Sequence, residues 1–533
     1  MLPVILVVAG ILLNSMSTNA YNRKTFTAAV YEHSLIFPPN RSTVASRHNA
    51  LADVMVNLRI YDQQAKFAAS QDVDILVFPE DGLYGYTFNR DSIKHYLEEI
   101  PDPKSEVWNP CTQPNRYSKT EIQVYLSCMA LNNSMYIVAN MGNKQRCTRR
   151  TDSNCPSDGQ YQYNTNVVYA PNGRLIARYH KQNLFYEYQF DRPRSVNYAF
   201  FETPFGRFGT FTCFDILFEE PAITLIERYN VSNIVFPTAW MDALPLLSAI
   251  QFHSAFAQGM GVNFLAANIH VPNKRFHGSG IYTPDGPKKF YYNDVGYGGG
   301  KLIISQLNVI ENRHQHVAYN KVQRPSSEQK TFHSYVFYDK FTFVELQRSS
   351  GVLSVCNNRL CCHLEYAINK DNSDMYAFGA FDGLHTHEGQ YYLQICTLLR
   401  CANKTRSSCG QPTKQAYSEF NDIKIYGTFQ TNYVFPEVLK SRKRDGQLNL
   451  ATNGWKYNNG VLRATRKTTH PVLSVSLFGR IYSRDKLPPG YHFTGSGSKS
   501  LSSSLYVSLL TPALLLAVYG SSIACGLFTR MNN

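Results

Sequence analysis

The sequence predicts an α/β domain followed by a mainly β domain. With 533 residues the chain is too long for one ordinary core, and 44% hydrophobic against 17% charged residues describes a folded protein. Up to about residue 283, continuous apolar runs alternate with stretches of helical spacing, which is typical of buried sheets covered by helices. Beyond that point short β-type runs dominate. We place the boundary within 306–330.

The elements of the first domain follow from hydrophobic periodicity. In the segment 45–70, for example, Leu51, Val54 and Leu58 fall on one helical face. A second pattern, the Pro-Asn-Gly sequence at 171–173, turns a hairpin. The predicted strands cover residues 24–36, 73–80, 135–140, 164–180 as the hairpin, 206–212, 233–237, 263–268 and 278–283, and the predicted helices cover 45–70, 118–131, 214–226 and 246–259.

The second domain is expected to be β-rich and stapled by six cysteines. Glycines cluster in 296–300 and indicate flexible backbone ahead of it. Its predicted strands lie within 335–346, 351–358, 376–383, 390–401 and 423–430. The expected division of the chain is a signal peptide at 1–20, domains at 21–315 and 316–490, and a C-terminal signal at 491–533.

Both ends of the chain predict passage through the secretory pathway. Residues 1–20 are apolar and then turn polar, as in a cleaved secretory signal. Residues 505–528 carry no charge and follow the small, polar run TGSGSKSLSSS, the pattern of a GPI-anchor signal. A single transmembrane helix is the alternative. Four N-glycosylation sequons fit a secreted chain, at Asn40, Asn132, Asn230 and Asn403. We therefore expect the extracellular face of the plasma membrane, reached through a lipid anchor.

The amount and the distribution of charge favour a basic surface without a nucleic-acid partner. The formal charge is +14, but the Lys and Arg residues are spread along the chain. No basic helix or aromatic-basic module of the nucleic-acid-binding kind is evident. A solvated basic surface is the simpler interpretation.

Cysteine numbers single out Cys213. Of the twelve cysteines, Cys525 lies in the C-terminal apolar tail, so eleven remain. An odd number in an oxidising compartment implies one free thiol or an intermolecular bond. If Cys213 is free, four cysteines remain in the first half and six in the second, and each half can pair internally.

The local sequence around Cys213 fits a nucleophile. The stretch GRFGTFTCFDILFEEPA, residues 206–222, predicts a buried strand followed by a helix, with the thiol at the junction. Backbone N–H groups at a helix start lower a thiol pKa. A buried structural cysteine is the alternative, and this pattern alone does not separate the two.

Two further strand ends supply partners for that thiol. Glu80 ends the predicted strand 73–80, and Lys181 ends the hairpin strand. In α/β folds the carboxyl ends of strands meet at one rim, where sites form. Glu80 would accept the thiol proton and later activate water, while Lys181 would stabilise the thiolate and the oxyanion. A Cys-His pair remains open, since the chain has 15 histidines.

These segments carry a family resemblance. FPEDGLYGY at 78–86, RYHKQNLF at 178–185, the Cys213 stretch and FPTAWMDALPLLSA at 236–249 resemble the nitrilase superfamily, and more closely its secreted branch of vanins (pantetheinases) and biotinidase. FHSAFAQGM at 252–260 and the GPI-like tail resemble the vanins. The resemblance implies an α-β-β-α sandwich followed by a β-rich base domain. It also implies Glu80 as proton acceptor, Lys181 as proton donor and oxyanion stabiliser, and Cys213 as nucleophile.

The activity implied by that resemblance is hydrolysis of the linear amide of pantetheine to pantothenate and cysteamine, through a cysteine acyl-enzyme. No metal or organic cofactor is implied, and the expected partner is a small-molecule amide. Biotinidase-like cleavage of biotinyl amides is one alternative. A glycosylated surface protein that uses the same fold for binding or adhesion is another.

Supporting residues carry more than one interpretation. Glu187 is either a second carboxylate near the triad or a salt-bridged surface residue, and Trp240 either lines the pocket or belongs to the core. The backbone N–H of Phe214 is a candidate for the oxyanion hole.

His385-Thr386-His387-Glu388 has a metal-like pattern without a third ligand at a defined spacing. Cys361-Cys362-His363 favours disulfides over zinc in a secreted domain.

Overall fold

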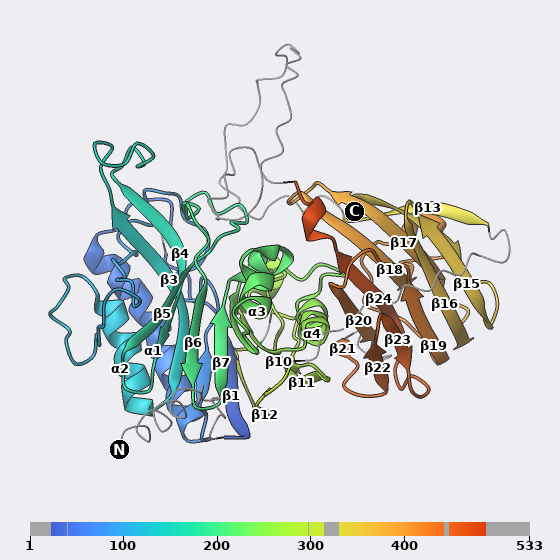
Figure 1. Ribbon diagram of the computed structural model, residues 1–533, viewed down its shortest axis with the longest axis horizontal. Helices are drawn as coiled ribbons and strands as arrows, with labels where there is room; N and C mark the ends of the chain where they lie inside the picture. The colour runs from blue at the N-terminus through green and yellow to red at the C-terminus, as the bar shows by residue number, and fades with distance from the viewer. Residues whose placement is uncertain (1–22, 40, 297, 314–329, 442–446, 487–533) are drawn as a thin grey trace, which may run out of the picture.

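The computed structural model describes residues 23–39, 41–296, 298–313, 330–441 and 447–486. They form two parts that pack side by side (Figure 1), one built on two six-stranded sheets and one on sheets of seven and five strands. The predicted order, α/β followed by mainly β, is confirmed. The signal peptide expected at 1–20 and the anchor signal expected at 491–533 lie outside the described residues. Within the described ranges, no helix is long and apolar enough to cross a membrane.

The first part contains two six-stranded sheets. One sheet has the order β12-β1-β2-β3-β4-β5 and the other β11-β10-β9-β8-β7-β6. The strands of the first are β1 Thr25–Glu32, β2 Ile75–Val77, β3 Tyr136–Arg146, β4 Gln160–Tyr169, β5 Leu175–His180 and β12 Lys301–Asn308. Those of the second are β6 Ala199–Thr203, β7 Gly206–Thr210, β8 Asn233–Thr238, β9 Asn263–Asn268, β10 Ser279–Thr283 and β11 Gly286–Tyr291.

The α/β part continues past the predicted change of character at residue 284. Strand β11 hydrogen-bonds to β10, and β12 returns to pair antiparallel with β1 at the edge of the first sheet. The limits predicted at 315 and 316 stay a prediction, because residues 314–329 lie outside the described part of the chain.

Helices and sheets stack in four layers. Helices α1 (Arg47–Ala69) and α2 (Glu121–Asn133) cover the outer face of the first sheet, in one apolar cluster with its side chains. The inner faces of the two sheets meet in a second cluster. Helix α4 (Ala249–Met260) covers the second sheet. This is the α-β-β-α sandwich that the family resemblance implied, with strand ends gathered at one rim.

The single helix predicted over 214–226 is wrong. The chain forms a 3₁₀ turn at Cys213–Leu217, a wide helical turn at Glu219–Ile223 and one short helix, α3, at Thr224–Glu227. Pro221 cannot donate a backbone hydrogen bond, and Glu220 before it is extended (φ −102°, ψ 124°). The nucleophile candidate therefore opens a tight turn rather than a long helix.

The β domain is a sandwich of two antiparallel sheets with orders β13-β14-β17-β18-β24-β20-β21 and β15-β16-β19-β23-β22. Side chains of both sheets share one apolar cluster. The strands of the first are β13 Thr331–Val336, β14 Asp339–Glu345, β17 Tyr376–His385, β18 Tyr391–Arg400, β20 Val434–Ser441, β21 Leu448–Leu450 and β24 Val472–Arg480. Those of the second are β15 Ser350–Asn357, β16 Leu360–Asn369, β19 Glu419–Gly427, β22 Trp455–Asn458 and β23 Val461–Ala464.

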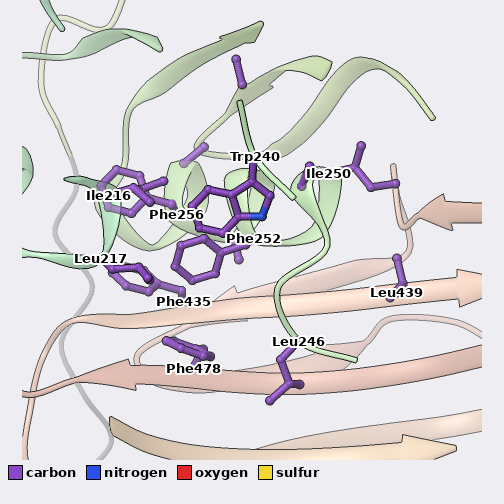
Figure 2. Packing of buried hydrophobic residues seen from close by; sticks show 14 of the residues in the cluster. Ile216, Leu217, Trp240, Leu246, Ile250, Phe252, Phe256, Phe435, Leu439 and Phe478 are labelled. Carbon is purple, nitrogen blue, oxygen red and sulfur yellow. The ribbon is translucent and has the colours of Figure 1, made fainter. Parts of the chain in front are cut away.

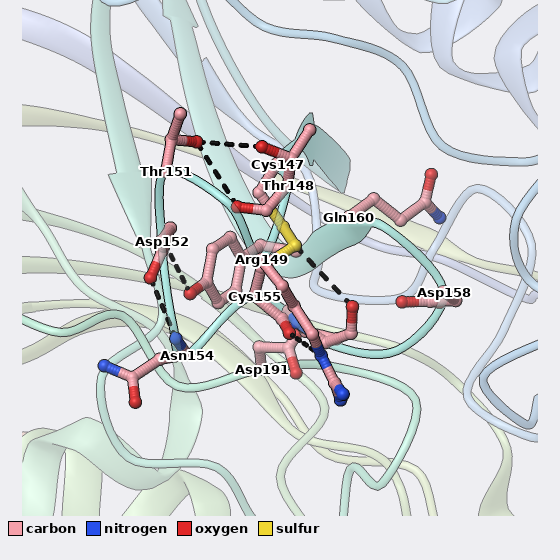
Figure 3. Close-up of a disulfide and its surroundings, with 12 residues drawn as sticks. Cys147, Thr148, Arg149, Thr151, Asp152, Asn154, Cys155, Asp158, Gln160 and Asp191 are labelled. Carbon is pink, nitrogen blue, oxygen red and sulfur yellow. Dashed lines mark hydrogen bonds between the residues drawn. A yellow bond between two sulfur atoms is a disulfide. The ribbon is translucent and has the colours of Figure 1, made fainter.

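Disulfides pair within each half, as the cysteine count predicted. The first half carries Cys111–Cys128 and Cys147–Cys155, the second of which closes the loop in Figure 3. The β domain carries Cys356–Cys361, Cys362–Cys396 and Cys401–Cys409, so the CCH pattern at 361–363 forms disulfides. Cys213 is the free cysteine of the described chain.

Helix α4 joins the two parts. It lies between the second sheet and the β domain, where Phe252 and Phe256 meet Phe478 and Phe435 at ring-centroid distances of 5.3 Å each (Figure 2). Ring-to-ring contacts of this kind stabilise a core by more than the burial of their apolar surface alone. The interface is therefore a continuous apolar core, which fixes the β domain against the strand ends.

Candidate active site

The three residues predicted at strand ends come together. Glu80 follows β2 by three residues, Lys181 follows β5 directly, and Cys213 follows β7 by three. All three line one cavity and are almost completely buried. The two sheets thus supply the groups jointly, with Glu80 and Lys181 from the first and Cys213 from the second.

Glu80 is held by three donors. Its Oε1 accepts hydrogen bonds from Lys181 Nζ at 2.7 Å and Asn164 Nδ2 at 2.8 Å, and its Oε2 accepts one from the backbone N–H of Ala239 at 2.8 Å. Such fixation leaves the carboxylate in one orientation toward the cavity. Asn164 and Ala239 were not predicted from the sequence.

Glu187 is the second carboxylate of the site, not a surface residue. Its Oε2 lies 2.6 Å from Lys181 Nζ and accepts the Phe185 N–H at 3.0 Å. Burial opposes the charge on Lys181, but Glu187 and Glu80 outweigh it and raise the Lys181 pKa well above its usual range. Burial also raises the pKa of Glu187. Lys181 is therefore a fixed ammonium between two carboxylates.

Cys213 sits on a strained turn. Its φ of +47° is in the left-handed region, which is uncommon for a residue with a side chain. Asp215 secures the turn: it accepts the Thr212 N–H at 3.1 Å, the Tyr179 hydroxyl at 2.6 Å and the Asn183 N–H at 2.8 Å. Sequence reasoning missed Asp215. An acidic residue within an otherwise apolar buried stretch was the available signal.

The expectation of a lowered thiol pKa is wrong. Burial, with the Glu80 carboxylate next in effect, raises the Cys213 pKa well above its usual range, and Lys181 opposes this only in part. The resting group is a neutral thiol, so it needs a base such as Glu80 to become a nucleophile.

Trp240 and Phe214 both line the cavity. The Trp240 indole donates to Leu247 O at 2.9 Å and stacks on Phe252 at 5.8 Å, so it belongs to the cavity wall and the core at once. The Phe214 ring packs against Phe185 at 5.0 Å. The role of the Phe214 backbone N–H stays a prediction.

The β domain forms the other wall of the cavity, which sequence reasoning did not foresee. Its residues there include Phe337, Tyr391 and a cluster of three polar groups. In that cluster, His385 Nδ1 lies 2.8 Å from Asp339 Oδ2 and His385 Nε2 lies 2.9 Å from Glu388 Oε2. The metal-like sequence pattern at 385–388 thus places both ring nitrogens of His385 on carboxylates.

The sequons lie on the surface where they are described. Asn132, Asn230 and Asn403 are exposed, as N-glycosylation requires, and Asn40 lies outside the described residues.

Comparison with known proteins agrees with this architecture. Residues 27–255 match the carbon-nitrogen hydrolase family, so the first domain has the fold of an enzyme class that cleaves C–N bonds. Residues 330–485 match the vanin C-terminal domain. The chain is 50% identical to mouse (Mus musculus) pantetheinase and 49% identical to the human (Homo sapiens) one, each time over 86% of this chain and 90% of the relative. It is 42% identical to human biotinidase over the same shares. The chain belongs to the vanin family of carbon-nitrogen hydrolases, with biotinidase as a related branch.

Proposed function

We propose that the chain hydrolyses the linear amide of pantetheine, giving pantothenate and cysteamine through a cysteine acyl-enzyme. The arrangement of a buried thiol, a fixed carboxylate and a fixed ammonium in one cavity supports this role. The substrate is inferred from the identity to pantetheinases, which exceeds the identity to biotinidase.

In the first half-reaction Glu80 takes the proton from Cys213, and the sulfur attacks the pantothenoyl carbonyl carbon. The Lys181 ammonium, with the Phe214 N–H, stabilises the oxyanion that forms. The intermediate collapses, the C–N bond breaks, and protonated Glu80 gives its proton to the departing nitrogen. Cysteamine leaves, and a thioester joins pantothenate to Cys213.

In the second half-reaction Glu80 takes a proton from water, whose oxygen attacks the thioester carbon. The C–S bond breaks, pantothenate leaves, and the proton on Glu80 returns to the sulfur. Glu187 shares the charge of Lys181 with Glu80 throughout. Because the Cys213 thiol is neutral at rest, each turnover starts with that proton transfer.

The direct test is Cys213→Ala. We expect cysteamine release from pantetheine to fall at least about a thousandfold, because the nucleophile is lost. The thermal unfolding temperature and the surface display should stay close to those of the wild type, since the side chain lost is small. Full activity in this variant would overturn the proposal. Wild-type protein that hydrolyses no amide would instead favour a binding or adhesion role.

A substrate pair separates the two enzymatic candidates. Release of cysteamine from pantetheine and of lysine from biotinyl-lysine are measured as kcat/KM on the same preparation. Pantetheine should be preferred by at least tenfold. A preference for the biotinyl amide would reassign the chain to a biotinidase-like activity.

We also propose that the protein works on the outer face of the plasma membrane. Five disulfides favour an oxidising compartment, and three described sequons are exposed. The anchor rests on the sequence pattern of 491–533. Release of the protein from cells by a phosphatidylinositol-specific phospholipase should follow, whereas retention would favour a transmembrane helix.

A further inference from the structure

The β domain contacts the turn that carries Cys213 at Leu217 and at the following residue, Phe218. Arg480, the last residue of β24, donates from Nε to the backbone oxygen of Leu217 at 2.9 Å. Tyr391 of β18 meets the Phe218 ring edge-on at 6.0 Å. The turn is thus held from outside its own domain.

Arg480 is built as a rigid connector. It is completely buried, and Asp485 accepts from both of its terminal nitrogens, at 3.1 Å and 2.6 Å. Its guanidinium lies over the rings of Tyr391 and Tyr482, at 5.2 Å and 4.5 Å. A buried guanidinium persists only when its donors are satisfied, and a planar fork fixes direction as well as distance. The Nε–H is therefore aimed at one carbonyl, that of Leu217.

Leu217 is the far end of the Cys213–Leu217 turn and lines the cavity itself. Asp215 fixes the near end from within the catalytic domain. Without a second support the turn could relax its positive φ at Cys213, since such a conformation persists only where its surroundings over-determine it. Arg480 supplies the support from the opposite side.

We propose that Arg480 is a positioning residue: through the Leu217 carbonyl it holds the Cys213 turn in its reactive conformation, so the β domain completes the catalytic site. This rests on the proposed role of Cys213 as nucleophile. It gives the β domain a mechanical part in acylation, and it predicts that loss of Arg480 slows bond formation at sulfur without weakening the binding of the acyl group.

The experiment compares Arg480→Met with Arg400→Met in the full-length protein. Arg400 is also a buried β-domain arginine, bonded to Asp374 at 3.1 Å and to the Cys401 and Ala402 carbonyls. It ends β18 at the opposite end from Tyr391, about 30 Å away at strand rise. Both variants should unfold at lower temperature. Only Arg480→Met should slow acylation.

Two readouts are taken on protein shown to be folded by its thermal transition. The single-turnover acylation rate with pantetheine should fall at least tenfold in Arg480→Met, while the inhibition constant of pantothenate changes less than twofold. The alkylation rate of Cys213 by iodoacetamide should fall as well, and this readout does not depend on the substrate. If the wild type were alkylated at Cys213 but inert toward pantetheine, the proposed function would fail while this inference could still be tested.

Milder variants keep the outcome decisive if Arg480→Met does not fold. Arg480→Lys keeps the positive charge but loses the planar guanidinium group. Asp485→Asn keeps Arg480 but weakens the ion pair that holds its guanidinium in place. We expect the acylation rate to be highest in the wild type, lower in Asp485→Asn and lowest in Arg480→Lys. The alkylation rate of Cys213 should follow the same order. Wild-type acylation and alkylation in the folded variants, or an equal loss in Arg400→Met, would overturn the proposal.

Discussion

Two sites facing one cavity hold a cation between two carboxylates, and they differ in what the cation is. In the catalytic domain Lys181 lies between Glu80 and Glu187. In the β domain His385 lies between Asp339 and Glu388. The Lys181 and His385 side chains are equally buried, at 2% exposed, while Glu80 and Glu187 are 2% and 11% exposed and Asp339 and Glu388 are 12% and 16% exposed.

The difference in chemistry follows from the cation. Lys181 stays charged at every physiological pH, since its carboxylates raise its pKa well above an already high value. Burial alone would lower the His385 pKa, but hydrogen bonds to Asp339 and Glu388 raise it to about 9. The first arrangement suits a permanent charge next to a reacting thiol. The second is a structural tie whose charge depends on pH.

The largest expected contrast is between Glu80→Gln and Glu388→Gln. Glu80→Gln removes the proposed proton acceptor and should lower kcat/KM for pantetheine by about 10²–10⁴-fold. Glu388→Gln removes a carboxylate that touches His385 rather than Cys213, and should cost less than tenfold. Both changes keep the side-chain shape. Equal losses in the two variants would mean that the sites are not functionally distinct.

A second contrast concerns stability, and compares Lys181→Met with His385→Gln. Lys181→Met leaves Glu80 and Glu187 buried without their cation, and breaking a buried pair costs about 3–5 kcal/mol. His385→Gln should cost less, because both of its carboxylates are partly exposed whereas Glu80 is not, and because Gln still donates a hydrogen bond. Denaturant unfolding measures both. A greater loss of unfolding free energy in His385→Gln than in Lys181→Met would mean that the His385 cluster, not the Lys181 cluster, contributes more to stability.

The sequence allowed the strand-end residues to be predicted because each follows a predicted strand, and a strand is a local pattern. Cys213 also followed from counting. The β-domain wall could not be foreseen, since His385 lies far along the chain from Cys213 and the packing of the two domains brings them to one cavity. The thiol pKa was predicted in the wrong direction for the same reason: burial is a tertiary property.

The smallest expected effect is the pH dependence of the His385 tie. A histidine whose folded pKa is raised from 6.5 to about 9 stabilises the fold fully below pH 6.5 and loses that contribution as pH rises to about 9. The shift corresponds to about 3 kcal/mol. The groups facing the ring are Asp339, Glu388 and Tyr391, with exposed His387 nearby.

The measurement is the difference in unfolding free energy between wild type and His385→Gln at several pH values from 6 to 9.5. That difference should shrink steadily across the window. His253→Gln is the control: burial lowers the His253 pKa to about 3, so its folded form stays neutral throughout and its difference should hold constant above pH 6.5. A His385 difference that also stays constant would mean that the ring is neutral between its carboxylates, and the two clusters would then differ in charge as well as in burial.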